Sequence, residues 1–356
     1  MTLEELEPKG LSSPSHFIHL VDNFAKPVMC LLVDVIQWFL DNGIDYEPES
    51  IYTDVRAVID KAHPLFHLAA ASDPKVILEK DPNLRPMLES LRNHGKSTFL
   101  MTNSPFDIVD AGMIYMLGKD WQNLFDLVIV SAKKPSFFDA KKRHFRVYSP
   151  RTRRLKWQRV VSLERGKIYS GVSELFFVKI NNFKHNSYNS LKGNYETLQR
   201  MTGWNPNRVL YFGDHPYADL ASSSLGWRTC AIIEDLEEEI DKANDPQVKF
   251  KVNWSNTLQG LLDTYQDAID DPECHQVLAE WKEELDLNRV ELKNVYNENF
   301  GSVFRSKKSP TFFCRRLFRV ADVYTSRVTN FANFSLNHTF YPRRGVLPHE
   351  FKSWFV

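Results

Sequence analysis

The chain has 356 residues, 43% of them hydrophobic, and its 45 Lys and Arg residues are balanced by 45 Asp and Glu. This length and apolar content suffice to bury a large core, and the balanced charge predicts no general attraction to nucleic acid or to membrane surfaces. No apolar run reaches bilayer length and the four cysteines lack metal-ligand spacing, so we expect neither a membrane-spanning protein nor a zinc module.

The first 85 residues predict a helical region behind an acidic start. Residues 1–7 match neither a signal peptide nor a transit peptide, so we expect a cytoplasmic protein, or a mitochondrial one if a longer N-terminus exists. Apolar residues recur at three- and four-residue steps over 28–40, which predicts a helix ended by the Asn-Gly that follows. Similar spacing predicts helices over 51–63, closed by Pro64, and over 84–94.

The pattern then changes to short apolar runs rich in β-forming residues, with helical stretches between them. Strands are predicted near residues 97–103, 124–130, 208–213 and 229–233. Alternating strands and helices are typical of a parallel sheet with right-handed crossovers. The predicted fold class is therefore α/β, with a parallel sheet and a mainly helical N-terminal cap.

Polar residues follow three of these strands, and ligands in such sheets bind beyond the carboxyl ends of the strands. The candidates are Thr102 and Asn103 after the first strand, Lys134 after the second, and Asp214 and Asp219 after the third. Two carboxylates at this spacing suit Mg²⁺, which prefers oxygen ligands and keeps several waters. Taken singly, the Asp pair is equally well explained as a solvated turn, and a Thr-Asn-Ser turn is most often only a helix N-cap. Their occurrence together and in this order favours one shared site.

Several motifs together carry a resemblance to a known family. In chain order they are Thr102-Asn-Ser, Lys134-Pro-Ser-Phe-Phe, Gly213-Asp-His-Pro-Tyr-Ala-Asp, Gly226-Trp-Arg-Thr, Phe300-Gly-Ser-Val-Phe-Arg and Phe340-Tyr-Pro-Arg-Arg. On these motifs the chain resembles the haloacid-dehalogenase-type 5′-nucleotidases, in particular the 5′-nucleotidase domain-containing proteins related to the cytosolic purine 5′-nucleotidase. The resemblance covers nearly the whole chain. It implies a haloacid-dehalogenase-like, Rossmannoid sheet and dephosphorylation of nucleoside 5′-monophosphates.

The resemblance also implies a role for each candidate residue. In such enzymes an aspartate attacks the phosphate and water then hydrolyses the aspartyl-phosphate, while Mg²⁺ and a lysine neutralise charge. Thr102 corresponds to the hydroxyl that binds phosphate, with the amide of Asn103 beside it. Lys134 corresponds to the lysine that holds the nucleophile and the phosphate. Asp214 corresponds to the direct Mg²⁺ ligand, and Asp219 to the acidic residue that supports the metal's water shell.

One part of the family pattern is missing from this sequence. The first family motif is a strand that ends in Asp-x-Asp upstream of the cap, and we expect this chain to begin inside the cap. The best internal imitation contains Asp34, but Ile36 stands where the second Asp belongs and the helical spacing runs through both. We therefore expect Asp34 to lie on a helix, the central nucleophile strand to be absent and the chain to be inactive as given. A shortened transcript or a gene-model artefact would explain that absence.

The motifs divide the chain into three predicted parts. Residues 1–85 form a partial helical cap, 86–250 a haloacid-dehalogenase-like core, and 251–356 a helical extension that packs on the core. The core contains a predicted hairpin, 144–160, and an Asn/Ser-rich insertion, 172–190, which the family lacks. The hairpin is basic, and we expect a solvated face there rather than a nucleic-acid patch.

The C-terminal extension predicts helices. Helical spacing dominates from Leu258 to Tyr296, with a break at Asp271-Pro272, and apolar residues recur at helical steps over 317–324. This last stretch is basic and aromatic, a composition also found in RNA-binding segments. Its helical spacing instead favours packing against the sheet.

Two functions of different classes remain open on the sequence. The first is a Mg²⁺-dependent phosphatase that acts on a nucleoside monophosphate or another phosphomonoester, with neither nucleic acid nor membrane as a partner. The second is a non-catalytic product that binds metal or partner subunits and assembles as a homo-oligomer, or as a hetero-oligomer with intact paralogues. The presence or absence of the Asp-x-Asp strand discriminates between them.

Overall fold

The computed structural model describes residues 25–139, 144–171, 194–268, 270–297, 300–306, 309–341 and 347–350. The predicted insertion over 172–190 lies outside these ranges. The chain forms two compact units, one of Met1–Asn205 with Tyr217–Ala221 and the other of Pro206–Pro216 with Ser222–Val356. The predicted division into cap, core and extension follows motif boundaries and stays a prediction.

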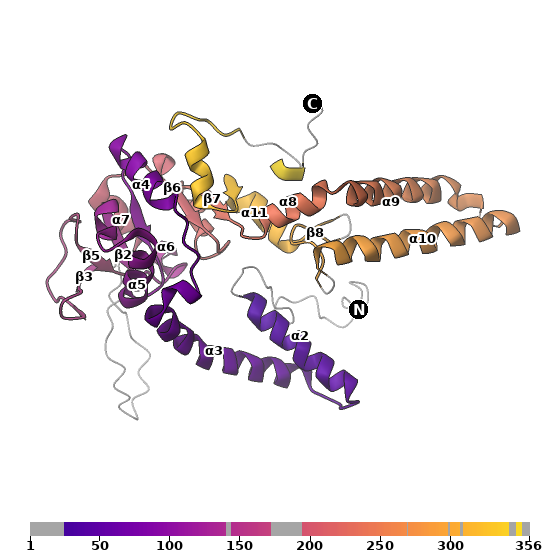
Figure 1. The fold of residues 1–356 in the computed structure, drawn as a ribbon, viewed down its shortest axis with the longest axis horizontal. Coiled ribbons are helices and arrows are strands. Elements are labelled where there is room, and N and C mark those ends of the chain that lie inside the picture. Colours follow the sequence, from indigo (N-terminus) through magenta and orange to yellow (C-terminus); the bar gives the residue numbers. More distant parts are fainter. Residues whose placement is uncertain are drawn as a thin grey trace. The chain divides into compact units, whose positions relative to one another are not determined.

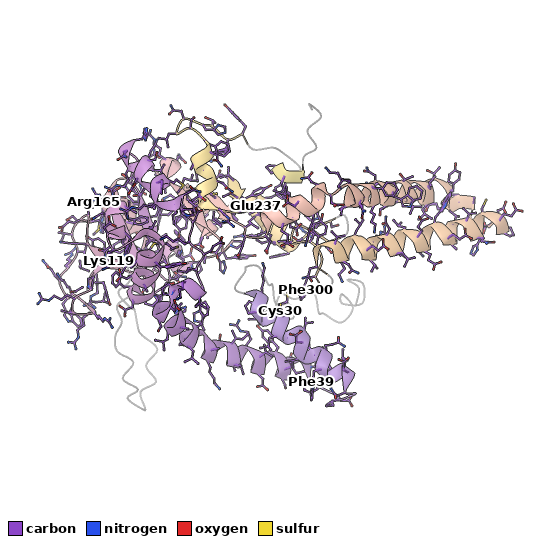
Figure 2. The ribbon with its side chains drawn as sticks, viewed as in Figure 1. Cys30, Phe39, Lys119, Arg165, Glu237 and Phe300 are labelled. Atoms are coloured by element: carbon purple, nitrogen blue, oxygen red, sulfur yellow. The ribbon has the colours of Figure 1, made fainter. Side chains whose placement is uncertain are left out.

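The first unit begins with the predicted helices. They are α2 (Lys26–Asp41), α3 (Pro48–Ser72) and α4 (Leu84–Asn93). Val28 of α2 is buried with Ile51 and Val55 of α3, and these residues form the core of an antiparallel helix pair. Phe39, labelled in Figure 2, packs near the end of α2 against Tyr46, with ring centroids 5.5 Å apart. The three-helix prediction is confirmed.

Pro64 does not close the second helix, contrary to the sequence prediction. Helix α3 continues through Pro64 to Ser72. A proline inside a helix removes one backbone hydrogen bond and crowds the preceding turn, so other contacts must stabilise the helix beyond it. Helix α3 packs against α5 (Phe106–Leu117) and buries Ala70 near its C-terminal end. This packing outweighs the local tendency of Pro64 to end the helix.

A five-stranded sheet lies at the centre of the first unit (Figure 1). Its strands, in spatial order, are β1 (Phe99–Met101), β2 (Leu127–Val130), β5 (Ile168–Ser170), β3 (Arg146–Ser149) and β4 (Arg154–Leu155). The first three strands are parallel, and β3 runs antiparallel to both of its neighbours. Two predicted parallel strands and the predicted hairpin are therefore confirmed. Strand β5 was not predicted, because Ile168–Ser170 stands in no longer run of apolar, β-forming residues such as the one that predicted β1.

A three-stranded parallel sheet lies in the second unit. Its order is β10 (Val323–Thr325), β7 (Arg228–Ile232) and β6 (Leu210–Gly213), so the other two predicted strands are confirmed. The predicted helix over 317–324 is wrong in its last part, because α11 (Phe312–Val320) ends before β10. The cause is Asp322, whose N–H donates to the Thr229 carbonyl at 3.0 Å and whose carboxylate accepts the Thr229 N–H at 2.9 Å. These bonds align the next residues with β7.

The described part of the second unit contains three further α-helices between its strands β7 and β10. They are α8 (Leu236–Asn244), α9 (Pro246–Tyr265) and α10 (Pro272–Tyr296). Helices α9 and α10 pack side by side as an antiparallel hairpin (Figure 1), in which Asn288 donates to the Ser255 hydroxyl at 2.7 Å. Among the described residues, no helix combines the length and the hydropathy that a bilayer crossing needs.

Candidate functional site

The carboxyl end of β1 continues into a turn that stays bonded to its neighbour strand. Thr102 donates its N–H to the Ile129 carbonyl at 3.0 Å, and its own carbonyl accepts the Ala132 N–H at 2.9 Å. The Thr102 hydroxyl oxygen accepts the N–H of Ser104 at 3.1 Å. Because this oxygen acts as an acceptor toward the turn, its hydrogen is left to point toward a ligand.

Asn103 joins this turn to the loop that follows β2. Its side-chain amide donates to the Lys134 carbonyl at 3.0 Å and accepts the Lys134 N–H at 2.7 Å. A two-point bond of this kind fixes both the position and the orientation of the Lys134 backbone. The side-chain amide of Asn103 is therefore a positioning group, and its backbone N–H is the part left to bind a ligand.

The loop after β2 has an unusual backbone. Ser131 and Lys133 have φ angles of 48° and 58°, in the left-handed region that non-glycine residues rarely adopt. Each such residue costs about 1–3 kcal/mol, and clusters of them occur at functional sites. Gly171, at the end of β5, allows this path, since a Cβ there would lie 2.8 Å from the Cα of Ala132. Nothing in the sequence pattern predicted this packing role for Gly171.

The Lys134 side chain turns inward and is nearly buried. Its Nζ donates to the Met101 carbonyl at 3.2 Å and forms an ion pair with the carboxylate of Asp219. Only 9% of the Lys134 side chain and 8% of the Asp219 side chain are exposed. Charges this deeply buried are tolerated only when they are paired and hydrogen-bonded. The sequence predicted both residues but not their direct contact.

The five predicted site residues are divided between the two units. Thr102, Asn103, Lys134 and Asp219 belong to the first unit, and the contacts above bring them together. Asp214 belongs to the second unit, where it directly follows β6 at the carboxyl end of that strand.

The first-unit cluster offers hydrogen-bond donors with no partner of their own. Within the described ranges, neither the Thr102 hydroxyl hydrogen nor the Asn103 backbone N–H donates to another group. Both follow β1 directly, and the ammonium group of Lys134 contacts the carbonyl of Met101, the last residue of that strand. Two free donors beside a cation form a setting that suits an oxyanion such as phosphate.

Asp34 takes no part in a strand. It lies on α2 with an exposed side chain, which confirms the helical prediction for this stretch. Among the described residues, no group of three or more His, Cys, Asp and Glu side chains gathers as a metal cluster. The described part of the chain therefore offers carboxylates to a metal singly or in pairs.

Comparison with known proteins identifies the family of this chain. The sequence model of the 5' nucleotidase family matches residues 3–352. The chain is 40% identical to 5'-nucleotidase domain-containing protein 2 of Rattus norvegicus and of Homo sapiens, over 342 residues that cover 94% of this chain and 57% and 61% of theirs. It is also 33% identical, over 358 residues, to a 5'-nucleotidase domain-containing protein of Dictyostelium discoideum, covering 98% of this chain and 57% of the relative. The chain thus spans roughly three fifths of these relatives, as those covered shares indicate.

Proposed function

The chain belongs to the 5' nucleotidase family, and we propose that its Thr102–Lys134–Asp219 cluster is the phosphate-binding part of a nucleotidase site. The substrate class is a nucleoside 5′-monophosphate. The observation that carries the proposal is the buried ammonium of Lys134, which lies at the carboxyl end of β1 beside two free donors.

We assign each residue a role that its contacts support. The Thr102 hydroxyl and the Asn103 backbone N–H donate to phosphate oxygens, and Lys134 neutralises their charge. Asp219 holds the ammonium in place, and the Asn103 side chain fixes the backbone from which Lys134 extends. Phosphoryl transfer depends on positioning and charge neutralisation more than on covalent help from such groups, so a preformed cluster suits it.

We infer that a haloacid-dehalogenase-like mechanism requires a nucleophilic aspartate that this chain lacks, and that the chain is therefore nearly inactive. The best sequence candidate for the nucleophilic aspartate of that mechanism, Asp34, is exposed on a helix. Without the nucleophile no aspartyl-phosphate forms, and only a small residual rate from positioning remains.

The metal we propose for this site is Mg²⁺. The donors are hard carboxylate oxygens, which fit this ion. Asp219 is already paired with Lys134, so its carboxylate suits hydrogen bonding to metal-bound water. The family resemblance implies that Asp214 is the direct ligand. A bound Mg²⁺ would supply further charge neutralisation at the phosphate.

With one direct carboxylate, Mg²⁺ binding is expected to be weak. Calorimetric titration should give an affinity weaker than about micromolar. Asp214→Asn should abolish the binding, whereas Asp241→Asn, which removes an exposed carboxylate on α8, should leave it unchanged. Sub-micromolar affinity, or equal binding by the two variants, would contradict the assignment.

Activity is tested by phosphate release from a panel of nucleoside 5′-monophosphates with Mg²⁺. We expect turnover at least about a thousandfold below that of a full-length relative, the scale on which enzymes lose rate when the covalent route is closed. Robust turnover that Lys134→Ala abolishes would show that a nucleophile is present in this chain. Asp34→Asn would then be the first variant to test.

A second function, a non-catalytic product that binds partner subunits such as intact paralogues, has one specific observation in its favour. In the described part of the two sheets, β1 and β6 are both edge strands. Parallel strands are normally buried, and an open edge is a template for pairing with another chain. Size-exclusion chromatography with a full-length relative tests this function, and the absence of a mixed complex would count against it.

A further inference from the structure

The basic hairpin, residues 144–163, stands out from the rest of the chain by its charge. Six of its twenty residues are Lys or Arg and none is Asp or Glu, although the whole chain carries equal numbers of both kinds. It contains β3 and β4, and β4 is the outermost strand of the five-stranded sheet. The positive charge is therefore concentrated at one edge of the first unit.

The cations of the basic hairpin are exposed and uncompensated. The exposed ones are Arg151, Arg153, Arg154, Lys156 and Arg159. Across the described residues, none of these side chains forms an ion pair or a hydrogen bond. Arg153 also has a φ angle of 50°, in a turn position where glycine would be unstrained. A row of solvated guanidinium groups without acidic partners attracts a polyanion.

Trp157 adds a flat apolar surface to this charge. The residue is 85% exposed, and the guanidinium carbon of Arg146 lies over its ring at 4.3 Å from the centroid. Arg146 is held beneath the ring by hydrogen bonds to the carbonyl groups of Lys156 at 3.1 Å and Leu155 at 3.5 Å. One face of the indole is therefore supported by a fixed cation, while the other face is open to solvent.

Protection of an edge strand explains only part of this arrangement. Charged side chains on an edge discourage pairing with other chains, which accounts for exposed Arg and Lys on β4. Edge protection does not account for the exposed indole of Trp157, because an exposed aromatic ring adds apolar surface to the edge. The sequence pattern favoured a solvated face, and the supported, exposed ring is the observation that changes this interpretation.

We propose that the basic hairpin binds single-stranded nucleic acid, with Arg151, Arg153 and Arg154 on successive phosphates and a base stacked on Trp157. Stacking of this kind needs an unpaired base, which favours a single strand over a duplex. Five of the six cations are arginines, whose planar forks match phosphate oxygens. An acidic membrane is the competing polyanion, but membrane anchoring requires a larger apolar face than one indole provides.

The test is fluorescence anisotropy of labelled oligouridylate and oligodeoxythymidylate of about twelve nucleotides, a length within the usual site sizes. The whole chain is titrated between about 50 and 200 mM salt. The triple variant Arg151→Ala, Arg153→Gly, Arg154→Ala should lower the slope of log affinity against log salt by about two, because each lost single-strand contact contributes about 0.7. Trp157→Ala should weaken binding about tenfold without changing this slope. Trp157→Phe keeps an aromatic ring and should retain most of the wild-type affinity.

A matched control separates this site from general charge. The variant Lys61→Ala, Lys80→Ala, Lys96→Ala removes the same number of exposed cations elsewhere in the first unit and should bind like the wild type. Equal losses in the two triple variants would overturn the proposal. It would also be overturned if neither oligonucleotide bound, or if only anionic phosphatidylserine vesicles bound the chain. Tighter binding of one oligonucleotide would assign RNA or DNA as the preferred strand.

Discussion

The parallel strands of the two sheets are fixed near their amino ends by the same arrangement, here called the Thr–Asp latch. Before β1, Thr98 donates its N–H to the carboxylate of Asp126 at 3.0 Å and its hydroxyl to the carbonyl two residues before that aspartate. At the start of β7, Thr229 makes the same two bonds around Asp322. In each latch the aspartate N–H returns a bond to the threonine carbonyl, at 2.8 and 3.0 Å.

The two units differ in how they hold a buried carboxylate. Asp219, in the first unit, is 5% exposed and is paired with the ammonium of Lys134. Glu239, in the second, is 8% exposed and is hydrogen-bonded by the Ser302 hydroxyl at 2.8 Å and the Val303 N–H at 2.6 Å. The comparison indicates that the repeated latch serves the fold, whereas the buried ion pair is specific to the proposed phosphate site.

The largest effect is expected from breaking the buried ion pair. Lys134→Met leaves the charge of Asp219 buried without a partner and should destabilise the protein by about 3–5 kcal/mol. Lys251→Met breaks a pair with Glu291 in which 34% and 60% of the side chains are exposed, and should cost less than about 1 kcal/mol. Urea unfolding measures both variants.

The double variant Lys134→Met, Asp219→Leu sharpens this test. Removing both charges should recover most of the stability, because no uncompensated charge is left. A Lys134→Met variant as stable as the Lys251→Met control would contradict the contrast between the two units.

The next effect concerns the two latches. Thr98→Val and Thr229→Val each remove a buried hydroxyl that donates to a backbone carbonyl, and each should cost about 1–3 kcal/mol. Because the residues belong to separate units, the two losses should add to within about 0.5 kcal/mol in the double variant. Thermal or urea unfolding checks this, and a large loss at one site with none at the other would show that the latches are not equivalent.

A smaller effect is expected in the pH dependence of stability. Burial raises the pKa of Glu239, although the bonds from Val303 and Ser302 and the nearby Lys242 act in the opposite direction. In the window between the unfolded and folded pKa values, the folded state holds more protons, so stability falls as the pH rises. Glu239→Gln should reduce the loss of unfolding free energy with rising pH, at pH values above the ordinary pKa of a carboxyl group. An unchanged slope of unfolding free energy against pH would contradict it.

The smallest effect is expected from removing the exposed arginines that pair with the two latch aspartates. Arg165 pairs with Asp126 at 3.7 Å and Arg228 with Asp322 at 3.1 Å, and more than half of each arginine side chain is exposed. Truncation of either to Ala should change stability by about 0–1 kcal/mol, because solvent and salt screen such pairs. A larger loss in low-salt unfolding experiments would make the arginine an essential part of the latch.

The sequence predicted those elements whose pattern of apolar residues extends over enough residues to be recognised. Helices such as α2, and the strands that end before Thr102 and Asp214, carry clear apolar patterns. Strands β5 and β10 carry no such pattern, and their strand conformation depends on pairing with distant residues. Pro64 shows the same limit, because tertiary packing there overrides a local signal.

The site residues were identified by motif, whereas their mutual contacts were not. Lys134 and Asp219 are 85 residues apart in the chain, and no local pattern predicts that a lysine and an aspartate at that distance will pair. Asn103 was predicted beside the phosphate, and the structure adds that its side chain fixes the Lys134 backbone. Such contacts depend on loop geometry that only the folded chain defines.

The central claim, that the carboxyl end of β1 binds phosphate, is tested most directly by calorimetric titration of inorganic phosphate. Thr102→Val removes the proposed hydroxyl donor and should weaken binding about tenfold or more, as expected for a hydrogen bond to a charged group. Thr98→Val makes the same change at the opposite end of β1, and at a temperature where it stays folded it should bind phosphate like the wild type. Equal phosphate affinity in Thr102→Val and wild type would contradict the account.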